Sequence, residues 1–167
     1  GSLAATNMTA KPVLNRAQFH TSVAQLRDLP YSRAEIAFAG RSNAGKSSAI
    51  NLLTRINRLA YTSKTPGRTQ LINFFAVDDD TYLVDLPGYG FAKAAKSVKR
   101  DWPEMIEGYL LERSNLAMVF VLVDGAIGPT TLDVQMLDWL RYNGVAHTVV
   151  ATKFDKVKSS KRATRKK

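Results

Sequence analysis

The residues with the clearest chemistry lie at positions 40–48, G-R-S-N-A-G-K-S-S, which fit the pattern G-x-x-x-x-G-K-[ST] of a phosphate-binding loop. Gly40 and Gly45 allow the backbone to turn and to approach phosphate oxygens closely. Lys46 is expected to reach the outer phosphates, and the Ser47 hydroxyl is expected to ligate magnesium. The other loop residues expected to contact the nucleotide are Arg41, Ser42, Asn43, Ala44 and Ser48. The sequence therefore predicts a nucleotide-phosphate site.

A second motif, D-L-P-G at residues 85–88, follows a short apolar segment. Asp85 is expected to hold the magnesium shell through water, and the Gly88 N–H is expected to approach the γ-phosphate. Leu86 and Pro87, between them, belong to the same predicted nucleotide-binding loop.

The loop T-P-G-R-T-Q at residues 65–70 offers a further magnesium ligand. Thr69 is expected to supply it when the γ-phosphate is present, and Thr65 is the alternative. Gly67 and Arg68 are assigned to the same nucleotide-contacting loop, where Arg68 either acts as an arginine finger or stays solvated. Lys46, Thr69 and Gly88 are thus the candidate catalytic residues.

The segment T-K-F-D at residues 152–155 indicates which base is bound. An Asp155 carboxylate can accept hydrogen bonds from N1–H and the exocyclic amine of guanine, and adenine offers no such pair of donors. The Lys153 stem can lie along the face of the base. Thr152 stands where many guanine sites have Asn, and its hydroxyl can make part of the same hydrogen bonding. The segment therefore favours GTP over ATP.

Composition indicates one folded domain with an uneven charge. The chain has 167 residues, of which 45% are hydrophobic, no cysteine, and a net charge of +10. Residues 156–167 contain seven Lys/Arg and no acid, which leaves +3 for the other 155 residues. This basic tail is either a solvated end or a contact for a polyanion such as RNA. A second basic cluster follows the D-x-P-G motif and would couple nucleotide state to an anionic partner: Lys93, Lys96, Lys99 and Arg100.

The longest apolar run, residues 116–123, has eight residues and is far shorter than a membrane span. With no secretory signal in the sequence, the expectation is a cytoplasmic monomer. Gly1 and Ser2 resemble the scar of a cleaved tag. Residues 1–17 are expected to form a flexible arm, and residues 18–167 a single domain.

Strand patterns alternating with helix patterns predict a three-layer α/β fold, with a mostly parallel sheet between helices. Strands are expected at residues 18–23, 35–39, 71–77, 81–84, 117–123 and 145–151, with the third and fourth forming an antiparallel hairpin and the last two buried. Helices are expected at residues 47–53, 98–113 and from Thr130 or Thr131 to Tyr142, with a helical turn at 24–29. The first helix has an apolar stripe at Ile50 and Leu53.

Taken together, N-A-G-K-S-S, T-P-G-R-T-Q, D-L-P-G-Y-G and T-K-F-D resemble the motifs of the EngB (YsxC/YihA) family of ribosome-biogenesis GTPases. The similarity runs from about residue 19 to residue 155. The resemblance implies a Ras-like G domain that binds GTP, GDP and Mg²⁺, assists assembly of the large ribosomal subunit and is needed for cell division. Family members continue to a final strand, a Ser-Ala loop over the base and a last helix. This chain ends in basic sequence instead, and weaker base affinity is expected.

Hydrolysis by the chain alone is expected to be slow, because Tyr89 occupies the position at which Ras-like enzymes have a water-orienting Gln. By resemblance, Asn43 can bind potassium where an arginine finger would lie; the alternative is that Asn43 only tolerates an unusual backbone angle. Two other functions remain open: a non-hydrolysing nucleotide-sensing module, and a P-loop kinase for a small acceptor. Asp155 and the D-x-P-G loop argue against the kinase.

Overall fold

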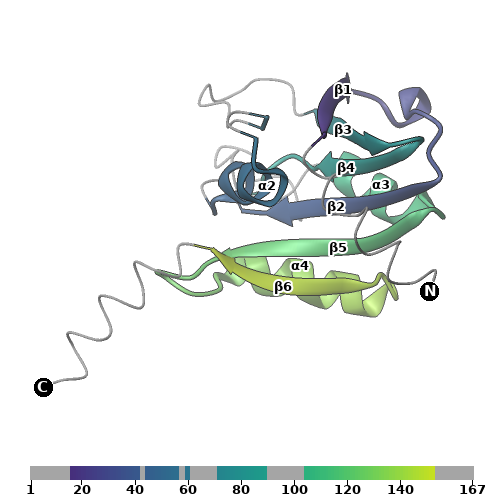
Figure 1. The fold of residues 1–167 in the computed structure, drawn as a ribbon. Helices are drawn as coiled ribbons and strands as arrows, with labels where there is room; N and C mark the ends of the chain where they lie inside the picture. Colours follow the sequence, from purple (N-terminus) through teal and green to yellow (C-terminus); the bar gives the residue numbers. More distant parts are fainter. Residues whose placement is uncertain (1–15, 42–43, 57–58, 61–70, 90–103, 153–167) are drawn as a thin grey trace, which may run out of the picture.

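Strands and helices alternate along the chain to build one sheet with helices on both of its faces, as the computed structural model in Figure 1 shows. The structure describes residues 16–41, 44–56, 59–60, 71–89 and 104–152. Over these residues the elements in chain order are β1 (Gln18–Val23), the short 3₁₀ helix η1 (Leu26–Asp28), β2 (Ala34–Gly40), α2 (Lys46–Thr54), β3 (Ile72–Asp78), β4 (Thr81–Asp85), α3 (Glu104–Glu112), β5 (Leu116–Asp124), α4 (Thr131–Tyr142) and β6 (His147–Thr152).

The sheet has the order β1-β3-β4-β2-β5-β6. Strand β2 pairs in parallel with β4 and with β5, and β5 pairs in parallel with β6. Strand β3 is antiparallel to both β4 and β1. The predicted three-layer α/β fold, with a mostly parallel sheet and one antiparallel hairpin, is confirmed. Because β4, β2, β5 and β6 are parallel, their carboxyl ends lie at the same end of the sheet. Ligands of such sheets bind at this end.

Two hydrophobic clusters, one on each face, hold the three layers together. Alternation along β2 sends Ala37 and Ala39 into the cluster that contains Ile106 of α3 and Met136 of α4. Phe38, between them, joins the opposite cluster with Ile50 of α2. Helix α2 therefore covers one face of the sheet, and α3 and α4 cover the other (Figure 1).

Helix α4 begins as predicted, since Thr130 is its N-cap and forms a reciprocal capping box with Asp133. The predicted turn at residues 24–29 contains η1. The predicted helix at 98–113 is described only as α3, and its earlier residues, with Trp102, lie outside the described part of the chain.

Two predictions about burial were wrong. The segment 145–151 was expected to be a buried strand, but β6 is an edge strand in which Val149 is 52% exposed. On α2, Leu53 is 43% exposed, and Thr54 is the buried partner of Ile50, with its hydroxyl donating to the Ile50 carbonyl at 3.0 Å. An apolar pattern predicts which residues favour burial, but it does not show whether another element of the fold covers them.

Strand β5 is buried at its end rather than along its whole length. Residues 121–124 are all buried, so this part is covered on both faces as expected, whereas Ala117 near its start is exposed. The buried part of β5 is therefore its carboxyl end, where the neighbouring parallel strands also end.

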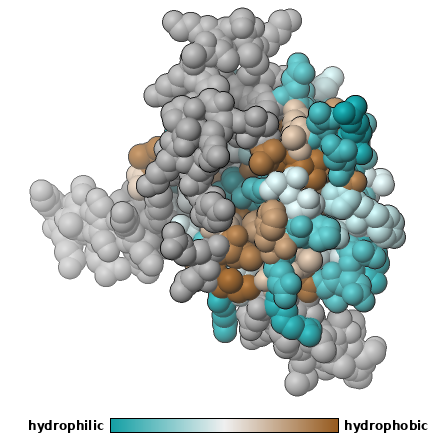
Figure 2. Space-filling view, turned by 90° about the horizontal axis from the view of Figure 1, so that it is seen from above, coloured by the Kyte–Doolittle hydropathy of each residue, from teal (hydrophilic) through white to brown (hydrophobic). Residues whose placement is uncertain are grey.

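The described surface mixes residue types. Seen from above in Figure 2, hydrophobic areas lie between hydrophilic ones. Exposed apolar residues are ordinary for a protein surface. Among the described helices, none is long and apolar enough to cross a membrane.

Candidate nucleotide-binding site

The predicted phosphate-binding loop lies between the end of β2 at Gly40 and the start of α2 at Lys46. Gly45 is the N-cap of α2 and has φ +89° and ψ 21°, in the left-handed region that favours glycine. A Cβ atom on Gly45 would lie 3.2 Å from Thr152 Oγ1, and one on Gly40 would lie 3.0 Å from the Leu122 carbonyl oxygen. Backbone angle and close packing therefore both explain glycine at position 45, and packing explains it at position 40.

Helix α2 directs its N-terminus toward this loop. Its first turn is closed by the Ala49 N–H, which donates to the Gly45 carbonyl at 2.9 Å. The N–H groups of a first helical turn have no acceptor within the helix, and the helix dipole makes this end electropositive. Such an end binds phosphate well. Lys46, Ser47 and Ser48 lie in this first turn, and their contact with a nucleotide stays a prediction.

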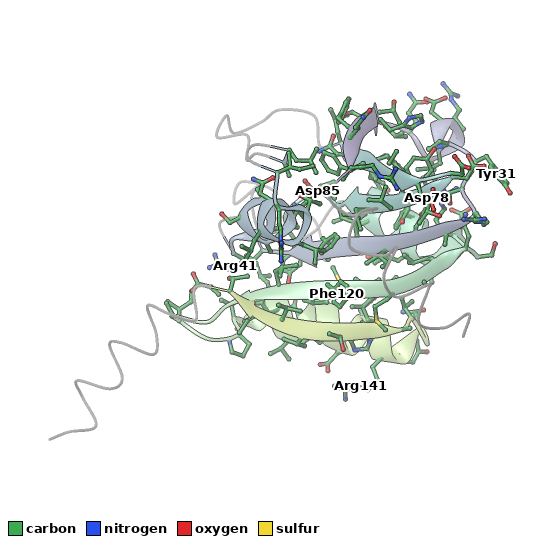
Figure 3. All side chains as sticks on the ribbon, in the orientation of Figure 1. Tyr31, Arg41, Asp78, Asp85, Phe120 and Arg141 are labelled. Atoms are coloured by element: carbon green, nitrogen blue, oxygen red, sulfur yellow. The ribbon has the colours of Figure 1, made fainter. Side chains whose placement is uncertain are left out.

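The P-loop lysine contacts the carboxylate of the second motif. Lys46 Nζ donates to Asp85 Oδ1 as an ion pair, and only 12% and 7% of the two side chains are exposed. Asp85 is the last residue of β4, next to β2 in the sheet. Figure 3 shows Asp85 and Arg41 at the end of the sheet where α2 begins, far from Tyr31. Two motifs separated in sequence therefore meet at one point.

The loop after β4 is held against the end of β2. The Leu86 N–H donates to the Phe38 carbonyl at 3.0 Å, and the Tyr89 N–H donates to the Gly40 carbonyl at 3.1 Å. Arg41 and Tyr89 also form an isolated parallel bridge. Within this loop Leu86 and Pro87 are buried and Gly88 is partly exposed. Gly88 is therefore the residue of the loop best able to meet a ligand.

Tyr89 does not face the loop surface. Its side chain is fully buried, and its hydroxyl donates to Asp133 Oδ1 at 2.6 Å. Burial, and then the hydrogen bond to Asp133, raise the pKa of the Tyr89 phenol well above its usual range. The phenol is thus neutral and turned into the core, which agrees with the expectation that it cannot orient water.

Thr152, predicted to assist base recognition, contacts the P-loop instead. Its hydroxyl lies within hydrogen-bonding distance of the Ala44 carbonyl and 3.2 Å from the Val123 carbonyl. The neighbouring Gly125 N–H donates to the Thr152 carbonyl at 2.7 Å, where a Cβ on Gly125 would come within 2.6 Å of the same oxygen. Thr152 therefore fixes the P-loop to the ends of β5 and β6.

The described residues bring together most of the predicted site: Gly40, Arg41, Ala44, Gly45, Lys46, Ser47, Ser48, Asp85, Leu86, Pro87, Gly88 and Thr152. The remaining predicted residues lie outside the described part of the chain: Ser42, Asn43, Gly67, Arg68, Thr69, Lys153 and Asp155. Asn51 was not predicted. Its side-chain amide donates to the Ala60 carbonyl at 2.8 Å and accepts from the Ala60 N–H at 2.7 Å, which anchors the chain after α2.

The donor set fits magnesium bound together with phosphates. Ser47 and Asp85 offer hydroxyl and carboxylate oxygens, the ligand type that this hard cation prefers, and magnesium usually takes only one or two protein ligands beside phosphates and waters. Over the residues that the structure describes, no group of three or more His, Cys, Asp or Glu side chains forms a separate metal site.

Comparisons with known proteins point to one family. The family model described as 50S ribosome-binding GTPase matches residues 35–153. The EngB GTP-binding protein of Thiobacillus denitrificans is 62% identical over 156 residues, which are 93% of this chain and 76% of that protein. The EngB protein of Pelotomaculum thermopropionicum is 51% identical over 151 residues, which are 90% of this chain and 76% of that protein.

A crystal structure of an EngB GTP-binding protein has a TM-score of 0.58 and 29% identity, and the match covers 75% of this chain and 73% of that one. The family model spans the P-loop, the D-x-P-G loop and Thr152, and the relatives match most of the chain. The chain therefore belongs to the EngB family of P-loop GTP-binding proteins.

Proposed function

We propose that the chain binds GTP and GDP with magnesium at this edge of the sheet and hydrolyses GTP slowly. The observation that carries the proposal is the contact of Lys46 with Asp85, because it joins the P-loop lysine to the D-x-P-G carboxylate. The bond from Thr152 to the Ala44 carbonyl supports it further, since it brings the first residue of T-K-F-D beside the same loop.

The residues then have distinct roles. The backbone N–H groups of residues 40–48 surround the phosphates. Lys46 leaves its ion pair with Asp85 and binds the outer phosphates instead. Ser47 and Thr69 would be direct magnesium ligands, and Asp85 would hold the magnesium shell through water. Magnesium, when bound, neutralises charge on the β- and γ-phosphates. Asp155 accepts the two guanine donors, with Lys153 along the base.

Hydrolysis transfers the γ-phosphoryl group to water. The water oxygen forms a bond to γ-phosphorus as the bond to the β–γ bridging oxygen breaks, which yields GDP and phosphate. Lys46 stabilises the charge that grows on the leaving oxygen, and the Gly88 N–H contacts the γ-phosphate. Because Tyr89 is buried against Asp133, its phenol does not position the water, and turnover of about 10⁻⁴–10⁻² s⁻¹ is expected.

We further propose a cytoplasmic, monomeric switch that acts in assembly of the large ribosomal subunit and is needed for cell division. Support comes from the family model, which is described as a 50S ribosome-binding GTPase. The buried Tyr89 favours one competing function, a nucleotide-sensing module without hydrolysis. Release of phosphate from GTP by the purified chain separates the two.

Base selectivity tests the proposed site. The chain should bind GTP and GDP in a titration of intrinsic tryptophan fluorescence, and it should bind ATP far more weakly. Asp155→Asn should weaken binding of GTP and favour binding of xanthine nucleotide, because the protein then offers a donor instead of an acceptor to that edge of the base. Equal binding of ATP and GTP by the unmutated chain would defeat the assignment.

A further inference from the structure

Tyr89 connects three segments of the site, although it was expected only to fail as a water-orienting residue. Its hydroxyl donates to Asp133 Oδ1 of α4 at 2.6 Å. Its backbone N–H donates to the Gly40 carbonyl at the start of the P-loop. The residue before it is Gly88, the partly exposed glycine of the D-x-P-G loop. One fully buried side chain thus joins this loop to helix α4.

Asp133 is committed to the start of α4 at the same time. Its Oδ2 accepts from the Thr130 N–H at 2.8 Å and from the Thr130 hydroxyl at 3.0 Å, while its own N–H donates to Thr130 Oγ1 at 3.3 Å. Asp133 is only 1% exposed. Both carboxylate oxygens are therefore used, one for the helix cap and one for Tyr89. Because an unsatisfied buried carboxylate oxygen is costly, the cap and the Tyr89 bond support each other.

We propose that Tyr89 and Asp133 form a positioning pair, which fixes the D-x-P-G loop against the start of α4 and couples movement of that loop to α4. The inference rests on the proposed GTP-operated site, since it concerns how that site responds to the γ-phosphate. The ligand that causes this movement is a nucleoside triphosphate, and a nucleoside diphosphate does not cause it.

The coupling follows from chain geometry and packing. Gly88 and Tyr89 are consecutive, so their Cα atoms are about 3.8 Å apart and a shift of Gly88 toward a phosphate moves the Tyr89 backbone as well. The phenol lies in a close-packed core and has little room to adjust. Either the bond to Asp133 breaks or the first turn of α4 follows. Because breaking this buried bond would leave a polar group unsatisfied, the first turn of α4 follows, and the nucleotide that shifts Gly88 shifts the α4 terminus.

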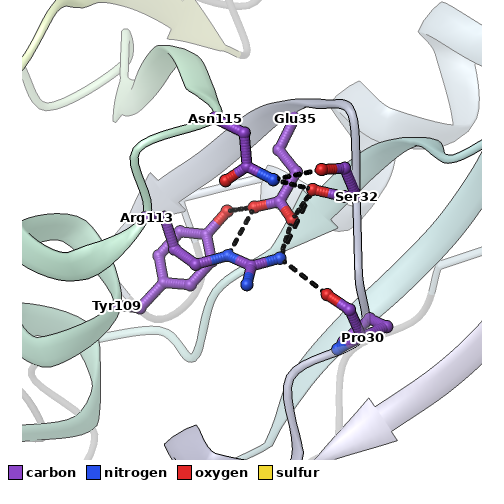
Figure 4. A network of polar contacts seen from close by, with 6 residues as sticks. All are labelled: Pro30, Ser32, Glu35, Tyr109, Arg113 and Asn115. Atoms are coloured by element: carbon purple, nitrogen blue, oxygen red, sulfur yellow. Dashed lines mark hydrogen bonds and ion pairs between the residues drawn. The ribbon is translucent and has the colours of Figure 1, made fainter.

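Tyr109 provides a matched control for Tyr89. Both tyrosines are fully buried, and both donate to a carboxylate. The acceptor of Tyr109 is Glu35, near the amino end of β2, in the polar network of Figure 4 and at the opposite end of the strand from the P-loop. Tyr109→Phe removes the same kind of bond without touching the nucleotide site.

The test compares Tyr89→Phe with Tyr109→Phe in the full chain. Thermal unfolding measures stability, and fluorescence titration measures the dissociation constants of GDP and of a non-hydrolysable GTP analogue. Both substitutions should lower stability, because each removes one buried hydrogen bond. Tyr89→Phe alone should change the ratio of the two dissociation constants, by about 5-fold or more. Tyr109→Phe should leave that ratio unchanged.

A second measurement follows α4 directly. The chain has no cysteine, so Val134→Cys creates a single labelling site, on an exposed residue next to Asp133. A fluorophore there should report different emission with the GTP analogue and with GDP, and Tyr89→Phe should abolish the difference. Equal emission with the two nucleotides in the labelled parent would overturn the coupling, even if the substituted chains failed to fold. So would an unchanged affinity ratio in folded Tyr89→Phe. A parent that bound no guanine nucleotide would instead overturn the proposed function.

Discussion

Gly45 is the residue on which the shape of the phosphate-binding loop depends most directly. It combines φ +89° with a neighbour, Thr152, that would lie 3.2 Å from a Cβ atom. Gly144 has a similar angle, φ +68°, but nothing within 4 Å of its Cβ position. The two glycines therefore separate backbone strain from crowding at the site.

We expect Gly144→Ala to cost only the strain of a left-handed residue, about 1–2 kcal/mol of unfolding free energy, and to leave GDP affinity unchanged. Gly45→Ala should add a displacement of Thr152, which holds the Ala44 carbonyl. GDP affinity should then fall by roughly tenfold or more. A strain of about 1–2 kcal/mol is relieved when the loop leaves the conformation that binds phosphate, and this energy is lost from binding. Urea unfolding and nucleotide titration of both variants measure the two effects, and equal GDP affinities would disprove the role given to Gly45.

We expect any effect of potassium on hydrolysis to depend on one residue. Asn43 precedes Ala44, whose carbonyl Thr152 holds, and potassium is proposed to bind Asn43. Hydrolysis should then be faster in potassium than in sodium at equal ionic strength, and Asn43→Ala should remove that difference, measured as phosphate release. An undiminished potassium response in Asn43→Ala would retire the proposal. A loss of nucleotide affinity in both salts would assign Asn43 to loop conformation instead.

Among the elements, the start of β2 and the end of α3 are joined by a buried charge network. Arg113, just after α3, pairs with Glu35 of β2, and 14% and 0% of their side chains are exposed. Ser32 Oγ and the Tyr109 hydroxyl both donate to the same carboxylate, and the Arg113 guanidinium also donates to the Pro30 carbonyl at 3.0 Å (Figure 4). This network is a structural tie between elements at the end of the sheet away from the candidate nucleotide site.

Arg113→Met should therefore destabilise the fold by about 3–5 kcal/mol, because it leaves the buried Glu35 carboxylate without its counter-charge. Its matched control is Arg141→Met, which breaks an ion pair to Asp138 at 3.6 Å whose side chains are 75% and 63% exposed. That control should cost no more than about 1 kcal/mol. Chemical denaturation measures the unfolding free energy of both variants. Similar losses in the two would contradict the structural role given to the buried network. For the folded fraction of either variant, GDP affinity should stay unchanged.

Elements whose residues follow a simple period could be predicted from the sequence, and contacts between elements could not. The strand at residues 35–39 and a helix capped by Thr130 or Thr131 are predictions from local patterns, and the structure has both, with Thr130 as the N-cap of α4. The burial of β6 was predicted wrongly because an apolar run does not tell an edge strand from a central one. The hydroxyl of Thr152 reaches Ala44 only because β6 ends beside the P-loop. The bond from Tyr89 to Asp133 likewise depends on packing and has no sequence signature.

At the scale of the whole molecule, much of the positive charge lies in two segments that follow motifs of the predicted nucleotide site in the sequence. The basic tail and the cluster at residues 93–100 supply eleven Lys/Arg of a chain whose net charge is +10. The cluster follows directly after the D-x-P-G loop and Tyr89 in the chain. A partner that binds it is therefore linked through the backbone to the loop that is expected to sense the γ-phosphate.

If these residues meet phosphates of ribosomal RNA, association should weaken steeply with salt, with a slope of about −0.7 to −0.9 in log K against log salt for each neutralised phosphate. The GTP form should bind large ribosomal subunits more tightly than the GDP form, by about 1–3 kcal/mol, since a switch transmits only the difference in affinity between its two forms. Co-sedimentation with large subunits, in a GTP analogue and in GDP across a salt series, measures both effects. A chain that ends before Lys156 should lose much of the salt slope and keep the nucleotide dependence. Association that ignores the nucleotide would reduce the tail to general electrostatic attraction, and no association at all would favour the nucleotide-sensing module.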